Sequence, residues 1–178
     1  MPILLGVDPG VSGGLAIIAG SPGKPPRIID CIKVPVDTTG RVDVLEVISF
    51  IQQNPPDLAI VERASAMPSI ATGKGAERRG MGATSAFNFG AAVFTVRTCI
   101  VGLGIKLVQV EAQAWKKAHG LSSKDPATGL KLEQREVKEL SRQKALRLFR
   151  NGERYFPLIG DHNKAESALI AAYGAMLV

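Results

Sequence analysis

The stretch LLGVDPGVSGG, residues 4–14, places an aspartate at the end of an apolar run and follows it at once with proline and glycines. The apolar residues before Asp8 are typical of a buried strand. A carboxylate at the end of such a strand must be paired, protonated or bound to a cation, because an isolated buried charge is costly. The glycines that follow suit a turn, a phosphate site or a metal site, so the rest of the chain has to decide among them.

The composition is that of an ordinary globular protein. The chain has 178 residues, of which 46% are hydrophobic and 21% are charged, and we expect residues 1–178 to form a single domain. No run approaches ~20 uncharged apolar residues, and no basic region precedes the first apolar stretch. We therefore expect neither a membrane span nor a signal peptide. Cys31 and Cys99 lie in apolar contexts and are expected to be reduced core residues.

The positive charge is concentrated in one segment. The formal net charge is +6, and residues 116–150 contain ten Lys and Arg against four Asp and Glu, while the remaining residues balance twelve against twelve. A local basic excess favours a polyanionic partner, because neutralising phosphates releases counterions. A basic helix face that is simply solvated explains the charge almost as well.

The order of apolar runs and turn signals predicts a mixed sheet flanked by helices. Helical spacing in the later segments alternates with short apolar runs, and the polar connection after Trp115 is expected to place His119 on the surface. The predicted strands are 3–8, 14–20, 27–34, 57–62 and 106–110, and the predicted helices are 42–53, 84–103, a short piece around Trp115, 133–150 and 163–177.

Acidic residues border three of these predicted elements. Asp8 and Glu62 each end a predicted core strand, and if the two strands are neighbours their carboxylates repel each other unless a cation lies between them. The entry to the last helix adds Asp161, His162 and Glu166. Oxygen-rich sites of this kind suit Mg²⁺ or Mn²⁺, and two such ions assist the hydrolysis of a phosphodiester.

Each acidic residue also has an ordinary structural explanation. Asn163 and Glu166 have the spacing of a capping box, in which Glu166 only satisfies the helix N-terminus. Asp8 before Pro-Gly suits a turn, and Glu62 has Arg63 beside it as a partner. The three acidic positions together favour a metal site, because core elements seldom end in unsupported charge.

Several motifs together resemble one family of nucleases. The sequence resembles the RuvC type of Holliday-junction resolvase, and especially its phage-encoded and chloroplast-type members. This resemblance implies an α/β, ribonuclease H-like fold with a mixed five-stranded sheet flanked by helices. The motifs that carry it are GVDPGVSGG, AIVERASAMP, FNFGAAVF, AQAWKKAHGL and DHNKAESALIAAYG.

The resemblance implies four metal ligands. Asp8, Glu62 and Glu166 match three of them. The chloroplast-type spacing selects Asp161 as the fourth, with His162 as the fallback, whereas many members of the family carry the ligand three residues before the last acid. This chain has Asn163 at that position.

The implied activity is metal-dependent cleavage of branched DNA. A homodimer would bind a four-way DNA junction and cut two opposed strands symmetrically, with two Mg²⁺ ions per site and Mn²⁺ as a substitute. The resemblance implies no membrane and no nucleotide cofactor, and a cytoplasmic protein of a phage or bacterium, or a trimmed organellar protein of the stroma or matrix. The phosphate-binding residues would be Lys74, Arg78, Arg79, Lys116 and Lys117.

Two other functions remain open at this stage. One is a ribonuclease H-like nuclease that acts on hybrid or branched DNA, and the other is a junction-binding protein without catalysis. A sugar kinase or actin-like phosphotransferase needs two related domains, and this chain has no second copy of the motif. Trp115 is expected to anchor the following turn, and Met67 is a weak candidate for a wedge between junction bases.

Overall fold

The computed structural model describes residues 1–64, 82–125 and 127–177. Five strands form one mixed sheet in the order β3-β2-β1-β4-β5, which confirms the predicted fold class. The first three strands are antiparallel neighbours, and β4 and β5 run parallel to β1. The strands are β1 (Ile3–Asp8), β2 (Gly14–Ala19), β3 (Arg27–Lys33), β4 (Leu58–Glu62) and β5 (Leu107–Val110).

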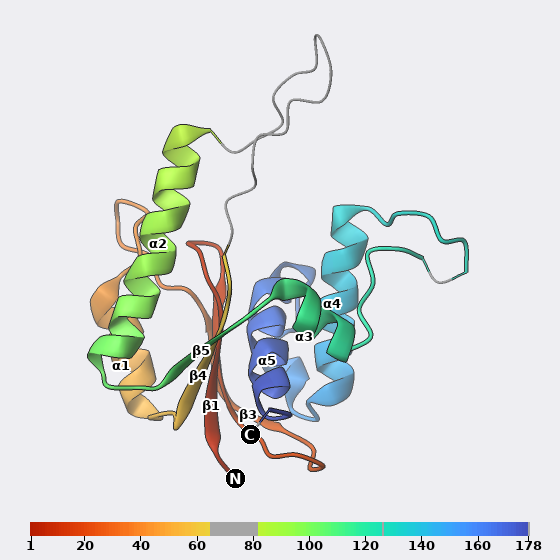
Figure 1. Ribbon diagram of the computed structural model, residues 1–178, viewed down its shortest axis with the longest axis horizontal. Coiled ribbons are helices and arrows are strands. Elements are labelled where there is room, and N and C mark those ends of the chain that lie inside the picture. Colours follow the sequence, from red (N-terminus) through yellow and green to blue (C-terminus); the bar gives the residue numbers. More distant parts are fainter. Residues whose placement is uncertain (65–81, 126, 178) are drawn as a thin grey trace.

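Helices cover both faces of this sheet (Figure 1). Helices α1 (Val44–Gln53) and α2 (Ala83–Gly102) pack on one face, and α3 (Ala112–Ala118), α4 (Gln134–Leu148) and α5 (His162–Gly174) pack on the other. Two short 3-10 turns, Gly152–Arg154 and Ile159–Asp161, connect α4 to α5. The central strands are therefore buried on both sides, which explains why their sequences are continuous apolar runs and do not alternate.

Alternate residues of the central strands face two separate cores. Leu4 and Ile60 belong to the core shared with α3, α4 and α5, whereas Leu5, Val7 and Val61 belong to the core shared with α1 and α2. This alternation is the period of two that a strand imposes on its side chains. The same alternation determines which face of the sheet the last side chain of each strand lies on.

Two glycines let α5 approach the sheet at backbone distance. A Cβ atom on Gly6 would lie 2.0 Å from the carbonyl oxygen of Ser167 and 2.6 Å from the backbone nitrogen of Ala171. A Cβ atom on Gly14 would lie 2.6 Å from the carbonyl oxygen of Asn163. Only glycine leaves room for the helix at these two positions, so α5 is seated directly on β1 and β2.

Helix α2 presents many apolar side chains to solvent. Phe87 is 75% exposed and Phe94 is 67% exposed, while Val96 and Ile100 pack in the core. Among the helices of the described residues, only α2 is long and apolar enough to cross a membrane. Helices that pack on a sheet also meet this criterion of length and composition. The apolar character of α2 therefore exceeds what its packing against the sheet requires.

One local prediction is wrong. His119 was expected on the surface but is buried, because the end of α3 lies against α5. Its Nε2 atom lies 2.8 Å from the carbonyl oxygen of Leu169, which satisfies the ring inside the core. Burial lowers the pKa of His119 below its usual value of 6.5, so the neutral form is favoured.

Candidate active site

Asp8 and Glu62 end two neighbouring parallel strands. Val7 of β1 pairs with Val61 of β4, so the two acidic residues occupy equivalent positions one residue further along. Both valines pack in the core shared with α1 and α2. Because side chains alternate across a strand, Asp8 and Glu62 both face the α5 side of the sheet.

The third carboxylate comes from α5. Glu166 lines the same cavity as Asp8 and Glu62, and this cavity has a volume of about 730 Å³. Asn163, one turn earlier on α5, also lines it. The Asn163 side-chain Nδ2 donates a hydrogen bond to the carbonyl oxygen of Ser12, in the turn after β1. This bond uses the amide nitrogen and leaves Oδ1 as an acceptor.

The carboxylates at the cavity repel one another. Burial raises the pKa of Asp8 well above its ordinary value of 3.8, and the negative charges of Glu166 and Glu62 raise it further. The positive charges of Lys116 and Lys138 act in the opposite direction. The cavity therefore concentrates negative charge on oxygen atoms and has two lysines within electrostatic reach.

The chain's only tryptophan holds Glu62. Trp115 Nε1 donates a hydrogen bond to Glu62 Oε2 over 2.7 Å. Burial raises the pKa of Glu62 above its ordinary value of 4.5, and the Trp115 bond and the Lys116 charge offset part of that rise. Arg63, the ordinary partner considered for Glu62, instead pairs with Glu111, with 2.8 Å between Arg63 Nη1 and Glu111 Oε1.

Glu166 is held by α4 and does not cap a helix. Ser141 Oγ donates a hydrogen bond of 2.8 Å to Glu166 Oε1, and Ser141 is buried. Helix α5 already begins at His162, so the capping box considered for Asn163 and Glu166 does not form. Ser141 therefore holds one oxygen of Glu166, and the carboxylate is not used to cap the helix N-terminus.

The structure does not bring Asp161 to the cavity. Asp161 Oδ2 accepts a hydrogen bond of 3.0 Å from the Leu158 backbone N–H, and Asp161 Oδ1 lies 3.0 Å from Lys164 Nζ. Burial raises the pKa of Asp161, but these two contacts outweigh it and leave the pKa below 3.8. The carboxylate stabilises the turn into α5.

His162 also lies away from the cavity lining. Its Nδ1 atom is 3.3 Å from the carbonyl oxygen of Ile159 in the preceding turn. The residue of α5 that lines the cavity together with Glu166 is Asn163, three residues earlier in the helix. The structure thus places Asn163 at the cavity and places Asp161 and His162 outside its lining.

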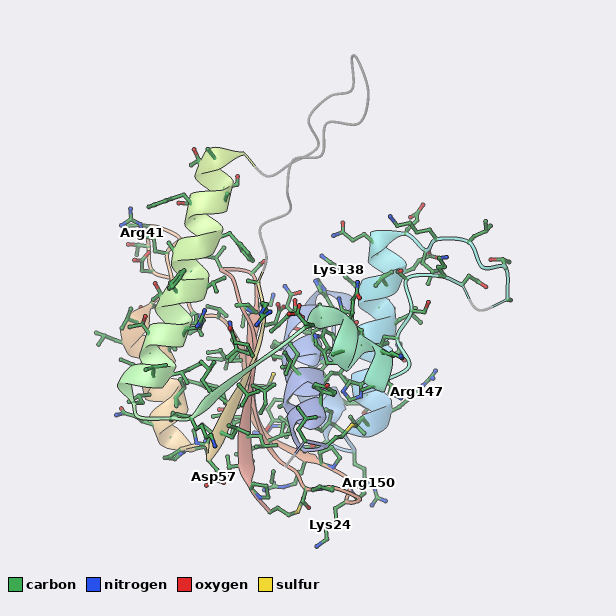
Figure 2. The ribbon with its side chains drawn as sticks, viewed as in Figure 1. Lys24, Arg41, Asp57, Lys138, Arg147 and Arg150 are labelled. Carbon is green, nitrogen blue, oxygen red and sulfur yellow. The ribbon has the colours of Figure 1, made fainter. Side chains whose placement is uncertain are left out.

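The predicted basic residues have different positions. Lys116 is partly buried, with its Nζ 5.0 Å from the centre of the Trp115 ring, and Lys117 is exposed. Lys138 lies toward the N-terminal end of α4, which is the end nearer the C-terminal ends of β1 and β4. Arg147 lies toward the opposite end of the helix (Figure 2). Only part of the basic segment is thus near the acidic cavity. The remaining residues considered in the sequence, Met67, Lys74, Arg78 and Arg79, lie outside the described residues.

Sequence reasoning missed Lys138 and Ser141. Both lie on the 133–150 helix predicted from the sequence, three residues apart, which places them on one face of that helix. A lysine and a serine on one face of a basic helix are a weak signal, because either is common on a solvated surface. Only the packing of α4 against α5 shows that this face is turned toward Glu166.

The residues at the cavity have the chemistry of a divalent cation site. Their donors are three carboxylates and one amide oxygen, the ligand types that suit Mg²⁺ and Mn²⁺. Across residues 1–64, 82–125 and 127–177, no three His, Cys, Asp or Glu side chains lie close enough to form a complete metal centre. Burial raises the pKa of Asp8 most, and repulsion from Glu166 and Glu62 raises it further; a bound cation would relieve that repulsion.

The fold matches those of solved Holliday junction resolvases over nearly the whole chain. T. thermophilus RuvC in complex with a Holliday junction substrate has a TM-score of 0.65 and 14% identity, and the match covers 98% of this chain and 96% of that chain. A second Thermus thermophilus RuvC structure has a TM-score of 0.60 and 15% identity, with coverage of 98% and 96%. The fowlpox virus Holliday junction resolvase has a TM-score of 0.57 and 14% identity, with coverage of 99% of both chains.

These matches establish the fold at low sequence identity. No family model matches the chain, and no curated protein matches it. The chain has the ribonuclease H-like fold of RuvC, which confirms the predicted resemblance.

Proposed function

We propose that the protein is a structure-specific endonuclease that resolves four-way DNA junctions by metal-dependent hydrolysis of phosphodiester bonds. The observation that carries this proposal is the single cavity that Asp8, Glu62 and Glu166, from β1, β4 and α5, all line. The match in fold supports it, because T. thermophilus RuvC and the fowlpox virus resolvase were both solved with Holliday junction DNA.

In this proposal the cavity residues hold two Mg²⁺ ions, for which Mn²⁺ substitutes. Asp8, Glu62 and Glu166 supply carboxylate oxygens, and Asn163 supplies its amide oxygen. Divalent cations bound there would provide an activated water and positive charge for the leaving oxygen of a phosphodiester. Because the amide of Asn163 is neutral, this ligand set carries one negative charge fewer than a set of four carboxylates.

The lysines near the cavity are proposed to bind the DNA backbone. Lys116 and Lys138 already interact with the charge of Asp8, so a phosphate that approaches Asp8 also approaches both lysines. Their positive charge offsets the repulsion between the phosphate and the carboxylates. Exposed Lys117 is proposed to contact a more distant phosphate and fix the position of the DNA without reading its sequence.

Two copies of the chain are proposed to pair through α2. Five exposed or partly exposed residues of α2 repeat at alternating spacings of four and three, which is the pattern of a helix seam that packs against another helix. A second copy would cover the exposed phenylalanines and place two cavities in one symmetric assembly. Symmetric cleavage of two strands needs two such cavities. The repeat consists of Phe87, Ala91, Phe94, Thr98 and Val101.

The test is a cleavage assay with matched substrates. Labelled four-way junction, linear duplex and RNA–DNA hybrid of one sequence are incubated with the full chain in Mg²⁺ or in chelator, and the products are separated on denaturing gels. We expect paired nicks at symmetric positions, only in the junction and only with Mg²⁺. The variants Asp8→Asn and Glu62→Gln should abolish cleavage and preserve junction binding, because removing negative charge does not weaken phosphate attraction.

A matched control separates the role of the site from a general effect of charge. Glu153 is an exposed carboxylate in the turn after α4, so Glu153→Gln removes the same charge away from the cavity and should leave cleavage unchanged. Cleavage of the hybrid alone would support the proposed metal site but would contradict the junction as the substrate. Tight junction binding without cleavage would contradict the nuclease proposal and favour a binding protein.

A further inference from the structure

Trp115 lies between a hydrophobic core and the candidate active site. The residue is fully buried on α3, in the core that α3, α4 and α5 form on one face of the sheet. Its indole N–H is the only hydrogen-bonding group of the side chain, and it is directed at Glu62 Oε2. Since the ring cannot turn without opening a close-packed core, packing fixes the direction of this donor.

Glu62 needs such a donor more than an ordinary strand residue does. The backbone of β4 fixes the Cα atom of Glu62, but the torsion angle that orients a glutamate carboxylate is intrinsically broad. Trp115 holds Oε2 at 2.7 Å, and the hydrogen bonds of the described residues leave Oε1 without a partner. One oxygen is therefore held by the core, the other has no hydrogen-bond partner among the described residues, and Glu62 lines the cavity.

We propose that Trp115 is a positioning residue, whose indole N–H holds one oxygen of Glu62 so that the other stays available to a divalent cation. Groups behind the ligands of a metal site commonly orient them in this way. The inference rests on the proposed function, because it gives Glu62 the role of a cation ligand. A bond that only satisfies a buried indole would make the same contact but would not respond to the cation.

The first measurement uses the natural protein and its single tryptophan. A ¹⁵N-labelled chain gives one indole N–H signal in a proton–nitrogen correlation spectrum, and MgCl₂ is added while that signal is followed. We expect a saturable shift of the signal that Asp8→Asn abolishes, and a different starting position in Glu62→Gln. A signal that Mg²⁺ leaves in place, at concentrations where calorimetry detects binding, would overturn the proposal.

The second measurement removes the donor and keeps a ring. Trp115→Phe retains an aromatic side chain in the core and loses the N–H, and we expect Mg²⁺ affinity measured by calorimetry to fall about 10- to 100-fold. The matched control is Phe149→Leu, which changes another buried ring of the same core. The control should lose stability while keeping the Mg²⁺ affinity of the natural protein.

The outcomes separate this inference from the proposed function. Unchanged Mg²⁺ affinity in Trp115→Phe would overturn the positioning role, and if Trp115→Phe does not fold, the indole signal of the natural protein decides alone. Mg²⁺-dependent junction cleavage with an unresponsive indole would overturn only the role of Trp115. A natural protein that neither binds Mg²⁺ in calorimetry nor cuts junctions would overturn the proposed function, and this inference with it.

Discussion

Ser141 on α4 donates a hydrogen bond of 2.8 Å to Glu166 on α5. Trp115 makes the equivalent contact to Glu62, which lines the same cavity. Each glutamate thus has one oxygen held by a buried donor from the 112–148 segment. This segment overlaps residues 116–150, which carry the excess positive charge, and it also holds the side chains of two candidate ligands.

Removing the Ser141 hydroxyl is expected to weaken the site more than the fold. Ser141→Ala should lower Mg²⁺ affinity about 10-fold or more, because the Glu166 carboxylate loses its fixed orientation. The loss of one hydrogen bond should cost about 1 kcal/mol of unfolding free energy. Calorimetry with MgCl₂ and thermal melting measure the two effects. The control is Ser49→Ala on α1, on the opposite face of the sheet. The Ser49 hydroxyl accepts a hydrogen bond from Gln53, and its removal should leave Mg²⁺ affinity unchanged.

The charge of Asp8 is expected to destabilise the metal-free protein at neutral pH. Because burial and the neighbouring glutamates raise its pKa in the folded state, the folded chain binds more protons than the unfolded chain between pH 3.8 and the raised pKa. The contribution of Asp8 to stability therefore falls as pH rises through this window and is lowest above the raised pKa. In chelator at neutral pH, Asp8→Asn should melt about 2–4 °C higher, which corresponds to about 1 kcal/mol.

The pH and metal dependence of this difference provide its control. The gap in melting temperature between Asp8→Asn and the natural protein should widen as the pH is raised from mildly acidic to neutral. Adding MgCl₂ should reverse it, because a cation that binds only the folded state stabilises the natural protein more than the variant. A variant that melts lower than the natural protein in chelator at neutral pH would contradict the repulsion inferred at the cavity.

A methyl group at Gly6 is expected to push α5 off the sheet. The added Cβ would lie 2.0 Å from the backbone oxygen of Ser167, so the helix has to move, and Gly6→Ala should cost about 3 kcal/mol of unfolding free energy. Any folded fraction should bind Mg²⁺ more weakly, because Glu166 moves with the helix.

The control is a glycine with open space around it. Gly90 on α2 has no atom within 4 Å of its added Cβ, and Gly90→Ala should stabilise the fold by about 0.5–1 kcal/mol. Denaturant unfolding measures both variants.

A charge at Phe94 is expected to separate two copies of the chain. Phe94→Glu places a carboxylate in the middle of the proposed helix seam, where a second copy would desolvate it. Sedimentation should show a dimer for the natural protein and a monomer for this variant. Leu158 is also 67% exposed but belongs to the turn before α5, so Leu158→Glu should remain a dimer. A monomeric natural protein at micromolar concentration would count against pairing through α2.

Strand and helix order could be predicted from sequence because each central strand is a short apolar run bounded by turn residues and α1 has apolar residues at helical spacing. The apolar runs around Leu5, Ile17 and Ile60 predict strands, and the helical spacing after Asp43 predicts α1, whose N-terminus that side chain caps by accepting from two backbone N–H groups. His119 was misplaced because its local sequence is polar. Its burial depends on where α5 lies, and a contact between segments far apart in sequence leaves no local pattern.

The candidate site was predictable only where strand position determines it. Sequence placed Asp8 and Glu62 at the ends of two strands, and the parallel pairing of these strands in the structure brings both residues to the same edge of the sheet. The choice among Asp161, His162 and Asn163 depends on the rotation of α5 against the sheet, which Gly6 and Gly14 set through backbone contact. Spacing along the chain cannot report that rotation.

The sheet divides the molecule into two cores that share no side chain, and this division bears on how such a protein changes over evolution. Substitutions on the outward face of α2 affect one core at most, while the acidic cavity is supported by the other. In a pair of copies joined along α2, the distance and angle between the two cavities can drift while the chemistry of each cavity is conserved. Under the proposed function, related proteins that share the cavity residues can thus come to bind junctions of different geometry.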